Sequence, residues 1–107
     1  MVANVLGTRY IIEDATEQKY PYLSQVDGFC DTSIKRIVIR KFTADVGSLK
    51  DLEFYRRKCI RHELVHAFLF ESGLDTNSDW ARNEEIVDWI AMQLPKLSKL
   101  FTQLGIN

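Results

Sequence analysis

The sequence predicts an α+β fold: a small twisted N-terminal β-sheet packed on a long helix at about residues 49–72, then a second helix at about 79–94 and a short C-terminal helix. Three observations support this prediction. The segment IKRIVIRKF in the first half is rich in β-branched residues. A long helical pattern follows it and ends at Gly73, and a second helical pattern ends at Pro95. Strands first and helices afterwards is an order typical of α+β domains.

Short strands are expected in the first half of the chain. Residues 9–13 and 34–42 have the β-branched and aromatic content of strands. Between them, residues 20–26 give a weaker strand signal that ends at the turn dipeptide Asp27-Gly28. The sequence therefore predicts three strands before the first helix.

The first helix carries local start and stop signals. Ser48 is a candidate N-cap, with Asp51 three residues later. The helical pattern runs to Ser72 and stops at Gly73, a residue type favoured just beyond a helix C-terminus. The segment HELVH, residues 62–66, therefore lies deep inside a helix.

The second helix is expected to begin near Asn77 or Ser78 and to cover about residues 79–94. Pro95 should end or kink it, because proline lacks the backbone N–H that a helix interior needs. Residues 96–104 can then form a further amphipathic turn or two before Gly105.

The composition is that of a soluble globular protein with a single domain, residues 1–107, since 46% of the residues are hydrophobic and 27% are charged. A formal net charge of -1 provides no basic field, so neither nucleic acid nor a membrane surface is expected as a partner. The chain shows no signal-peptide pattern and no membrane-span pattern, which predicts a cytoplasmic protein. Cys30 and Cys59 are accordingly expected to be free thiols.

The segment HELVH has the geometry of a metal clamp. Residues four apart lie on one face of a helix, so His62 and His66 can aim their imidazoles at a common point. Glu63 is displaced by about 100° around the helix and can instead reach a water held by the metal. H-E-x-x-H works in this way in zinc peptidases.

The residues around the motif predict a buried central helix, because they make it apolar almost all round. Buried imidazoles need polar partners, and a metal ion would satisfy both. These apolar residues are Ile60, Leu64, Val65, Ala67, Phe68, Leu69 and Phe70.

A third protein ligand has to come from elsewhere, because a catalytic zinc usually has three and the chain contains only two histidines. The extended metzincin pattern would require Gly and His where this chain has Leu69 and Ser72. Cys59 shares the helical face but lies about 7.5 Å along the axis from the midpoint of the histidine pair, too far for a short side chain. It is interpreted as a packing residue, which leaves a carboxylate as the third ligand.

The segment RNEEIVDWIA, residues 82–91, offers such carboxylates. Glu84 and Asp88, four residues apart, flank the stripe that should face the core. One interpretation makes Glu84 a metal ligand and Asp88 the acceptor that orients an imidazole. The other makes them a solvated acidic face near a helix N-terminus. The core-facing stripe itself is predicted to contain Trp80, Val87, Ile90 or Ala91, and Leu94.

HELVH followed by NEEIVD on the next helix resembles the gluzincin pattern, H-E-x-x-H and then N-E-x-x-x-D. The match covers about residues 28–94 and is most similar to compact members, the minigluzincins and the ImmA/IrrE-like peptidases of phages and mobile elements. The resemblance implies a minimal zincin-like domain with one zinc per chain. It assigns Glu63 as the general base and Asp88 as the acid that hydrogen-bonds a ligand histidine, His62. The zinc ligands that it implies are His62, His66 and Glu84.

The chain departs from the gluzincin pattern in two ways. Glu85 directly follows Glu84 and is an alternative third ligand, and the downstream subdomain of the larger gluzincins is expected to be missing. The source of additional transition-state stabilisation is therefore open, with Tyr55, Arg61 and Arg82 as candidates.

The function implied is that of a small zinc-dependent endopeptidase whose substrate is a protein or peptide, with a regulatory protein suggested by the ImmA/IrrE resemblance. The alternative is a non-catalytic zincin-like domain that acts as a protein interaction module with a structural zinc. Substrate could add as a strand along residues 34–42 if that segment is a sheet edge. The cations of that segment, Arg36, Arg40 and Lys41, would otherwise keep an edge from aggregating.

Overall fold

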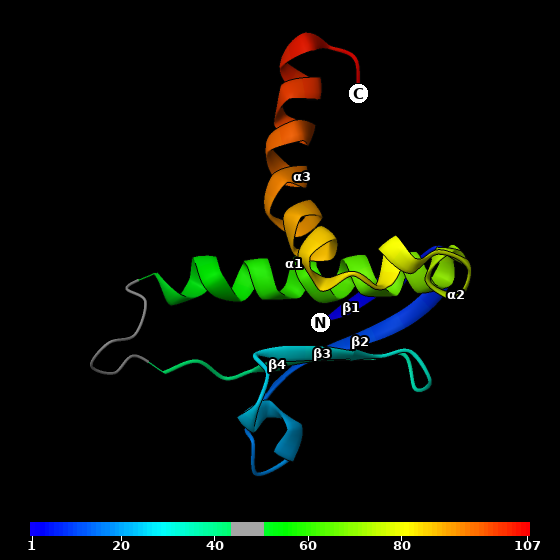
Figure 1. Cartoon of the computed structure of the whole chain (residues 1–107). Helices are drawn as coiled ribbons and strands as arrows, with labels where there is room; N and C mark the ends of the chain where they lie inside the picture. The colour runs from blue at the N-terminus through cyan, green and yellow to red at the C-terminus, as the bar shows by residue number, and fades with distance from the viewer. Residues whose placement is uncertain (44–50) are drawn as a thin grey trace.

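The computed structural model of the chain describes residues 1–43 and 51–107 and has a mixed α+β architecture (Figure 1). Within these residues, a four-stranded sheet formed by the first part of the chain is followed by three α-helices. The predicted fold class and the order of strands before helices are confirmed. Among the described helices, none is long and apolar enough to cross a membrane.

The sheet has the strand order β1-β2-β4-β3. Strand β1 (Val2–Val5) pairs antiparallel with β2 (Thr8–Ala15), and β2 pairs parallel with β4 (Arg36–Arg40). Strand β3 (Gly28–Asp31) pairs antiparallel with β4 and forms one edge of the sheet. The strand predicted at residues 34–42 is thus an inner strand.

The prediction for residues 20–26 is wrong. This segment forms a short 3-10 helix, η1 (Pro21–Ser24), and the strand begins after it, at Gly28. Pro21 explains the difference, because its fixed φ suits the first position of a helical turn and its missing N–H weakens a strand. Strand β1 was not predicted, although it forms a tight hairpin with β2.

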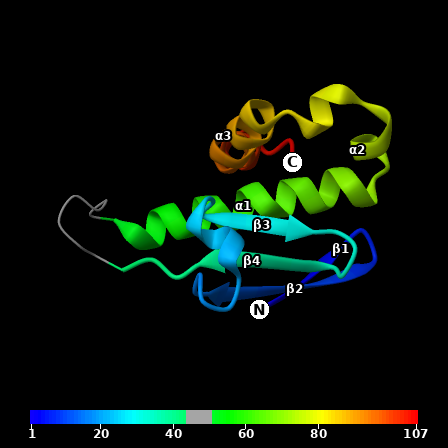
Figure 2. The same ribbon diagram turned by 60° about the horizontal axis from the view of Figure 1, so that its bottom comes forward.

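The two faces of the sheet are covered differently. Alternate residues of a strand point to opposite faces, so Ile37 and Ile39 of β4 pack under helix α1 (Leu52–Glu71) while Val38 packs with Leu23 of η1. Figure 2 shows α1 lying along the sheet, and Figure 1 shows η1 on the opposite side of the sheet. The core under α1 includes Tyr10, Ile12, Cys59, Ile60 and Ala67.

Helix α1 begins at Leu52, with Asp51 as its N-cap: the Asp51 carboxylate accepts a hydrogen bond of 2.9 Å from the Phe54 N–H. The predicted cap, Ser48, lies outside the described residues. At the other end, Gly73 has a φ of 88° directly after the helix, as predicted. The expectation of a buried central helix is confirmed only in part: Ala67 and Leu69 are buried, but Phe68 is 52% exposed.

Glu71 fixes the C-terminal end of α1 to the sheet. Its carboxylate accepts hydrogen bonds from the Thr8 hydroxyl at 2.8 Å, the Tyr10 hydroxyl at 2.9 Å and the Lys35 ammonium at 2.9 Å. The Lys35 contact and the two hydroxyl bonds lower the pKa of Glu71 despite its partial burial. These bonds hold the motif helix at a defined height over β2 and β4.

After α1 the chain forms a short helix α2 (Leu74–Asn77), a 3-10 turn η2 (Asp79–Arg82) and helix α3 (Glu84–Leu104). The predicted start at Asn77 or Ser78 is wrong. The N-cap of α3 is Asn83, whose side chain accepts from the Ile86 N–H at 3.0 Å. The predicted end at Pro95 and the separate C-terminal helix are also wrong, because one helix with Pro95 inside it continues to Leu104.

Arg61 explains how α3 accommodates Pro95. A proline cannot donate to the carbonyl four residues before it, here that of Ala91. The Arg61 guanidinium on α1 donates to this carbonyl at 2.7 Å, and Ala91 is almost completely buried. A side chain from another element thus satisfies the acceptor that the proline leaves free, and it ties α3 to α1.

Replacing Arg61 by Met is expected to lower the free energy of unfolding by about 1–3 kcal/mol, because a buried carbonyl loses its donor. In a Pro95→Ala background the loss should be smaller, since the alanine N–H can donate to the same carbonyl. Urea denaturation of the four proteins measures this coupling. Equal losses in the two backgrounds would contradict the assigned role of Arg61.

Candidate metal centre

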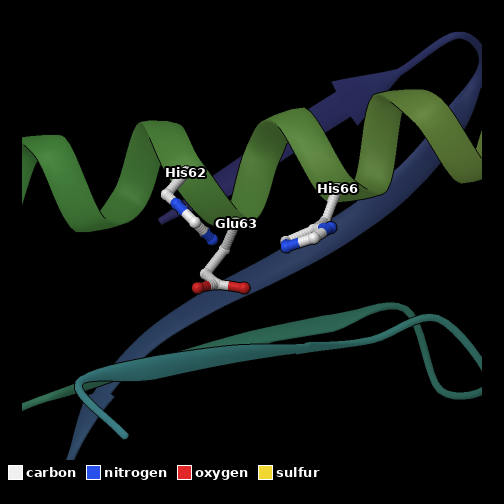
Figure 3. A group of neighbouring side chains, drawn as sticks. All are labelled: His62, Glu63 and His66. Atoms are coloured by element: carbon white, nitrogen blue, oxygen red, sulfur yellow. The ribbon is translucent and has the colours of Figure 1, made fainter. Parts of the chain in front are cut away.

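Three side chains with metal-binding atoms lie side by side on α1. His62, Glu63 and His66 each offer one ligand atom, and these atoms lie within 4.8 Å of one another. Figure 3 shows all three side chains leaving the same side of the helix toward the strands below it. The four-residue spacing of the histidines produces the common direction that the sequence predicts.

Helix α3 brings a carboxylate to both imidazoles. Glu84 is the first residue of α3, immediately after the Asn83 cap. Its Oε2 lies 2.9 Å from Nε2 of His62, and its Oε1 lies 2.7 Å from Nε2 of His66. Two imidazole nitrogens from α1 and one carboxylate from α3 therefore converge on a single point.

Asp88, one helical turn after Glu84, contacts the other ring nitrogen of His62. The distance from Asp88 Oδ1 to His62 Nδ1 is 2.9 Å. Because a carboxylate can only accept, Nδ1 of His62 donates to Asp88, and Nε2 is the nitrogen on which a cation would take the place of the proton now shared with Glu84. This is the orientation that a carboxylate partner gives to a metal-binding histidine.

Glu85 lies on a different part of the cleft. Within the described part of the chain it makes no hydrogen bond or ion pair with either imidazole. It lines a hollow next to Asp88 and Lys58 and is exposed. Consecutive helix residues are about 100° apart, so the geometry favours Glu84 over Glu85 as a third ligand.

Glu63 is the one buried charged residue of the described core, with 8% of its surface exposed. None of the described residues donates a hydrogen bond to its carboxylate, which faces the hollows on both sides of the motif. The pKa of Glu63 is raised to about 7, mainly by burial; His62 opposes this shift and the Glu84 carboxylate adds to it. Such a group can take up and release a proton near neutral pH.

The other site groups are held in forms that suit metal binding. Burial lowers the pKa of His66 and favours its neutral form, the one that coordinates metals. Burial alone would raise the pKa of Asp88, but the hydrogen bond from His62 and the Lys58 ammonium outweigh it, so that the pKa is lowered. Asp88 is therefore an anion at neutral pH.

Lys58 is a site residue that the sequence analysis missed. Its ammonium lies 3.1 Å from Asp88 Oδ1 and 5.2 Å from the centre of the Tyr55 ring. The available signal was its spacing, since position 58 is one turn before His62 on the same face. Lys58 is the one cation among the described residues that line the hollows beside the motif.

The three candidates for transition-state stabilisation are all engaged elsewhere. The Tyr55 hydroxyl donates to Asp27, and the Arg61 guanidinium donates to Ala91 on the opposite side of α1. Arg82 pairs with Asp79 at an exposed position. Their predicted role is not supported, because none of these donors is directed at the convergence point.

The cleft consists of two hollows on either side of the motif, of about 500 and 490 Å³. Both are lined by Glu63, Glu84 and Gly28, so β3 forms a common wall. A Cβ atom at Gly28 would lie 3.0 Å from a methyl group of Ile39 and 3.6 Å from Cγ of Glu63. The missing side chain therefore lets the edge strand approach the motif helix closely.

The predicted docking strand, residues 34–42, is not at an edge. It pairs on both sides, with β2 and with β3. Arg36 pairs with Glu13 at 2.8 Å instead of guarding a free edge. The free edge beside the cleft belongs to β3.

Both cysteines are free, as predicted. Cys59 is buried in the core under α1, which agrees with its interpretation as a packing residue. Burial raises the pKa of Cys30 to about 12, so this thiol is neutral and not a candidate metal ligand in its present surroundings.

In comparisons with protein-family models, curated proteins and solved structures, nothing matches this chain. The functional interpretation therefore rests on the residues of the site and their geometry.

Proposed function

We propose that the chain is a small zinc-dependent endopeptidase with a minimal zincin-like fold, a gluzincin-like arrangement of the site and one zinc per chain. The observation that carries this proposal is the convergence of two Nε2 atoms on one carboxylate, at 2.7 and 2.9 Å. A buried glutamate with no described hydrogen-bond donor stands beside that point. Two imidazoles, a carboxylate and an adjacent base are the groups that zinc hydrolases use.

The donor set fits zinc by its chemistry. Imidazole nitrogen and carboxylate oxygen are ordinary zinc ligands, and three protein ligands leave a further position open. In the metal-free arrangement, Glu84 accepts from both imidazoles, so the three groups are already held together by hydrogen bonds. A cation at the convergence point would replace the protons that the two imidazoles now share with Glu84. Because these side chains already have fixed positions, little conformational entropy would be lost on metal binding.

When bound, zinc supplies a Lewis acid that activates a water molecule and polarises a peptide carbonyl. Glu63 is the group that accepts the proton of this water and passes it to the leaving amine. Its burial keeps the pKa near neutrality, and a cation nearby would lower it toward the ionised form that a base needs. Asp88 holds His62 in the tautomer that presents Nε2, and Lys58 holds Asp88.

The substrate class that suits the cleft is an extended peptide, either free or as part of a protein. The free edge of β3 has backbone groups available for an added strand. Main-chain hydrogen bonds form with a peptide of any sequence. Such docking would therefore place a substrate peptide bond along the cleft without selecting the side chains of the substrate. A regulatory protein as the natural target is suggested by the ImmA/IrrE resemblance alone.

One observation favours the second candidate, a non-catalytic interaction module with a structural zinc. The donors Tyr55, Arg61 and Arg82 are engaged elsewhere, so none of these three is available to a developing oxyanion. The buried base favours the peptidase, because a purely structural site has no use for a carboxylate beside the open position.

Metal removal separates the two candidates. The purified chain is expected to contain one zinc and to cleave a mixture of unstructured peptides; a chelator should stop cleavage, and added zinc should restore it. Elemental analysis and mass spectrometry of the digest provide the measurements. Full zinc content without any cleavage would favour the structural role, and a chain that takes up no zinc would contradict both.

A further inference from the structure

The second half of α3 carries an apolar stripe that no described part of the chain covers. Figure 1 shows this half rising away from the sheet and from α1. Every residue from 94 to 107 is exposed. The stripe residues and their exposed fractions are Leu94 52%, Leu97 43%, Phe101 37% and Leu104 63%.

The spacing of the stripe is that of helices that pack along their length. From Ile90 the apolar positions follow in steps of four, three, four and three residues, which keeps them on one side of the helix. At Ile90 and Leu94 the stripe joins an apolar groove of about 620 Å³ between α3 and α1. The α1 wall of this groove includes Leu64, Val65 and Phe68.

The projecting half needs a packing partner to be a stable helix. It contains about three turns, and isolated helices of that length are marginal in water. Pro95 at its start weakens it further by removing a backbone hydrogen bond. Most helical stability in proteins comes from tertiary packing of an apolar face, and here that face is the stripe.

We propose that the stripe is a homodimer interface, in which α3 of a second copy packs antiparallel across a two-fold axis between Leu97 and Phe101. In this register Leu97 of each copy meets Phe101 of the other, and Leu94 meets Leu104. A two-fold interface requires that, when residue i of one copy contacts residue j of the other, residue j of the first copy also contacts residue i of the second, and this register meets that condition. Leu104 of each copy then closes the groove beside Phe68 of the other.

Charge and area both fit a second copy. Lys96 and Lys99 lie on the sides of α3 away from the stripe, so two copies meet without like charges in contact. Covering the stripe, Leu100, Phe68 and the flanking polar atoms would remove on the order of 800 Å² from each copy, the size of a standard stable interface. Glu84 and Asp88 lie on another face of α3, so the metal centre stays open and the dimer does not depend on the proposed function.

The test is the mass of the 107-residue chain in solution over a concentration series, measured by light scattering. The expected mass is twice 12.4 kDa. Leu97→Glu places a charge against Phe101 of the other copy, twice in each dimer, and should raise the dissociation constant by about 100-fold or more. The matched control is Gln103→Glu, which introduces the same carboxylate about 140° around the helix from the stripe and should leave the dimer intact.

Leu104→Glu, at the other end of the stripe, provides a second variant with the same expectation. Circular dichroism of each variant confirms that the body of the protein is folded, independently of zinc binding and of any peptidase activity. A parent chain that stays at 12.4 kDa up to about millimolar concentration would overturn the proposal. So would a dimer that survives both Leu97→Glu and Leu104→Glu.

Discussion

Glu63→Gln is expected to retain one zinc per chain and to slow peptide hydrolysis by about 100-fold to 10,000-fold. The amide keeps the size and burial of the side chain but cannot accept the proton of the attacking water, and general-base catalysis contributes this order of magnitude. Rates of peptide cleavage with matched zinc content are the measurement. Hydrolysis at the parent rate would remove Glu63 from the reaction.

The control for this substitution is Glu85→Gln, because Glu85 is a second glutamate of the same cleft that makes no described contact with the imidazoles. It should leave both the rate and the zinc content unchanged. Comparing the zinc content of Glu63→Gln and Glu85→Gln also tests whether Glu63 is itself a metal ligand, since its carboxylate lies in the cluster with the two histidines. A loss of zinc in Glu63→Gln would assign Glu63 to the coordination sphere.

The metal-free protein gives a readout of Glu63 that needs no activity. Its pKa is raised from 4.5 to about 7 in the folded state by burial, so the folded protein binds the proton more tightly than the unfolded chain does. Relative to Glu63→Gln, the parent should therefore lose stability as the pH rises from about 4.5 to about 7 and show no further relative loss above that. Urea midpoints across this range measure the difference.

The motif helix could be predicted from sequence because its determinants are local. The histidine spacing and the stop signal at Gly73 lie within one segment and act through backbone geometry, whereas the N-cap was predicted at Ser48 and is Asp51 in the structure. The position of α3 depends on tertiary structure instead. Asn77, Ser78 and Asn83 are all suitable caps, and the local sequence does not indicate that only the last one brings Glu84 to the two imidazoles.

Two other differences arise from contacts between distant segments. Pro95 does not end the helix, because the carbonyl of Ala91 that it leaves without a donor accepts a hydrogen bond from Arg61, thirty residues before Ala91. The strand at residues 34–42 looked like a possible edge, since its cations suit one, but β4 pairs in parallel with β2 and leaves β3 outermost. Strand order is a property of the whole sheet, and alternation within one strand does not reveal it.

The third ligand is the part of the site where sequence left the choice between neighbours open. Glu84→Gln is expected to weaken zinc binding by more than about 100-fold, beyond the 10- to 100-fold that loss of an outer partner typically costs. Asp88→Asn is expected to lose less zinc affinity than Glu84→Gln, because the amide keeps the shape of the side chain and only weakens the acceptor for His62. Glu85→Gln should bind zinc as the parent does.

Competition with a chromophoric chelator, at fixed pH, measures the zinc affinity of each of the three variants and ranks the three residues by their contribution to zinc binding. The order Glu84, Asp88, Glu85 follows from the contacts: two imidazoles for the first, one imidazole for the second and none described for the third. If Glu85→Gln lost zinc while Glu84→Gln retained it, the metal would lie on the Asp88 side of His62. Another residue would then have to be the general base, since Glu63 lies beside the point where Glu84 meets the two imidazoles.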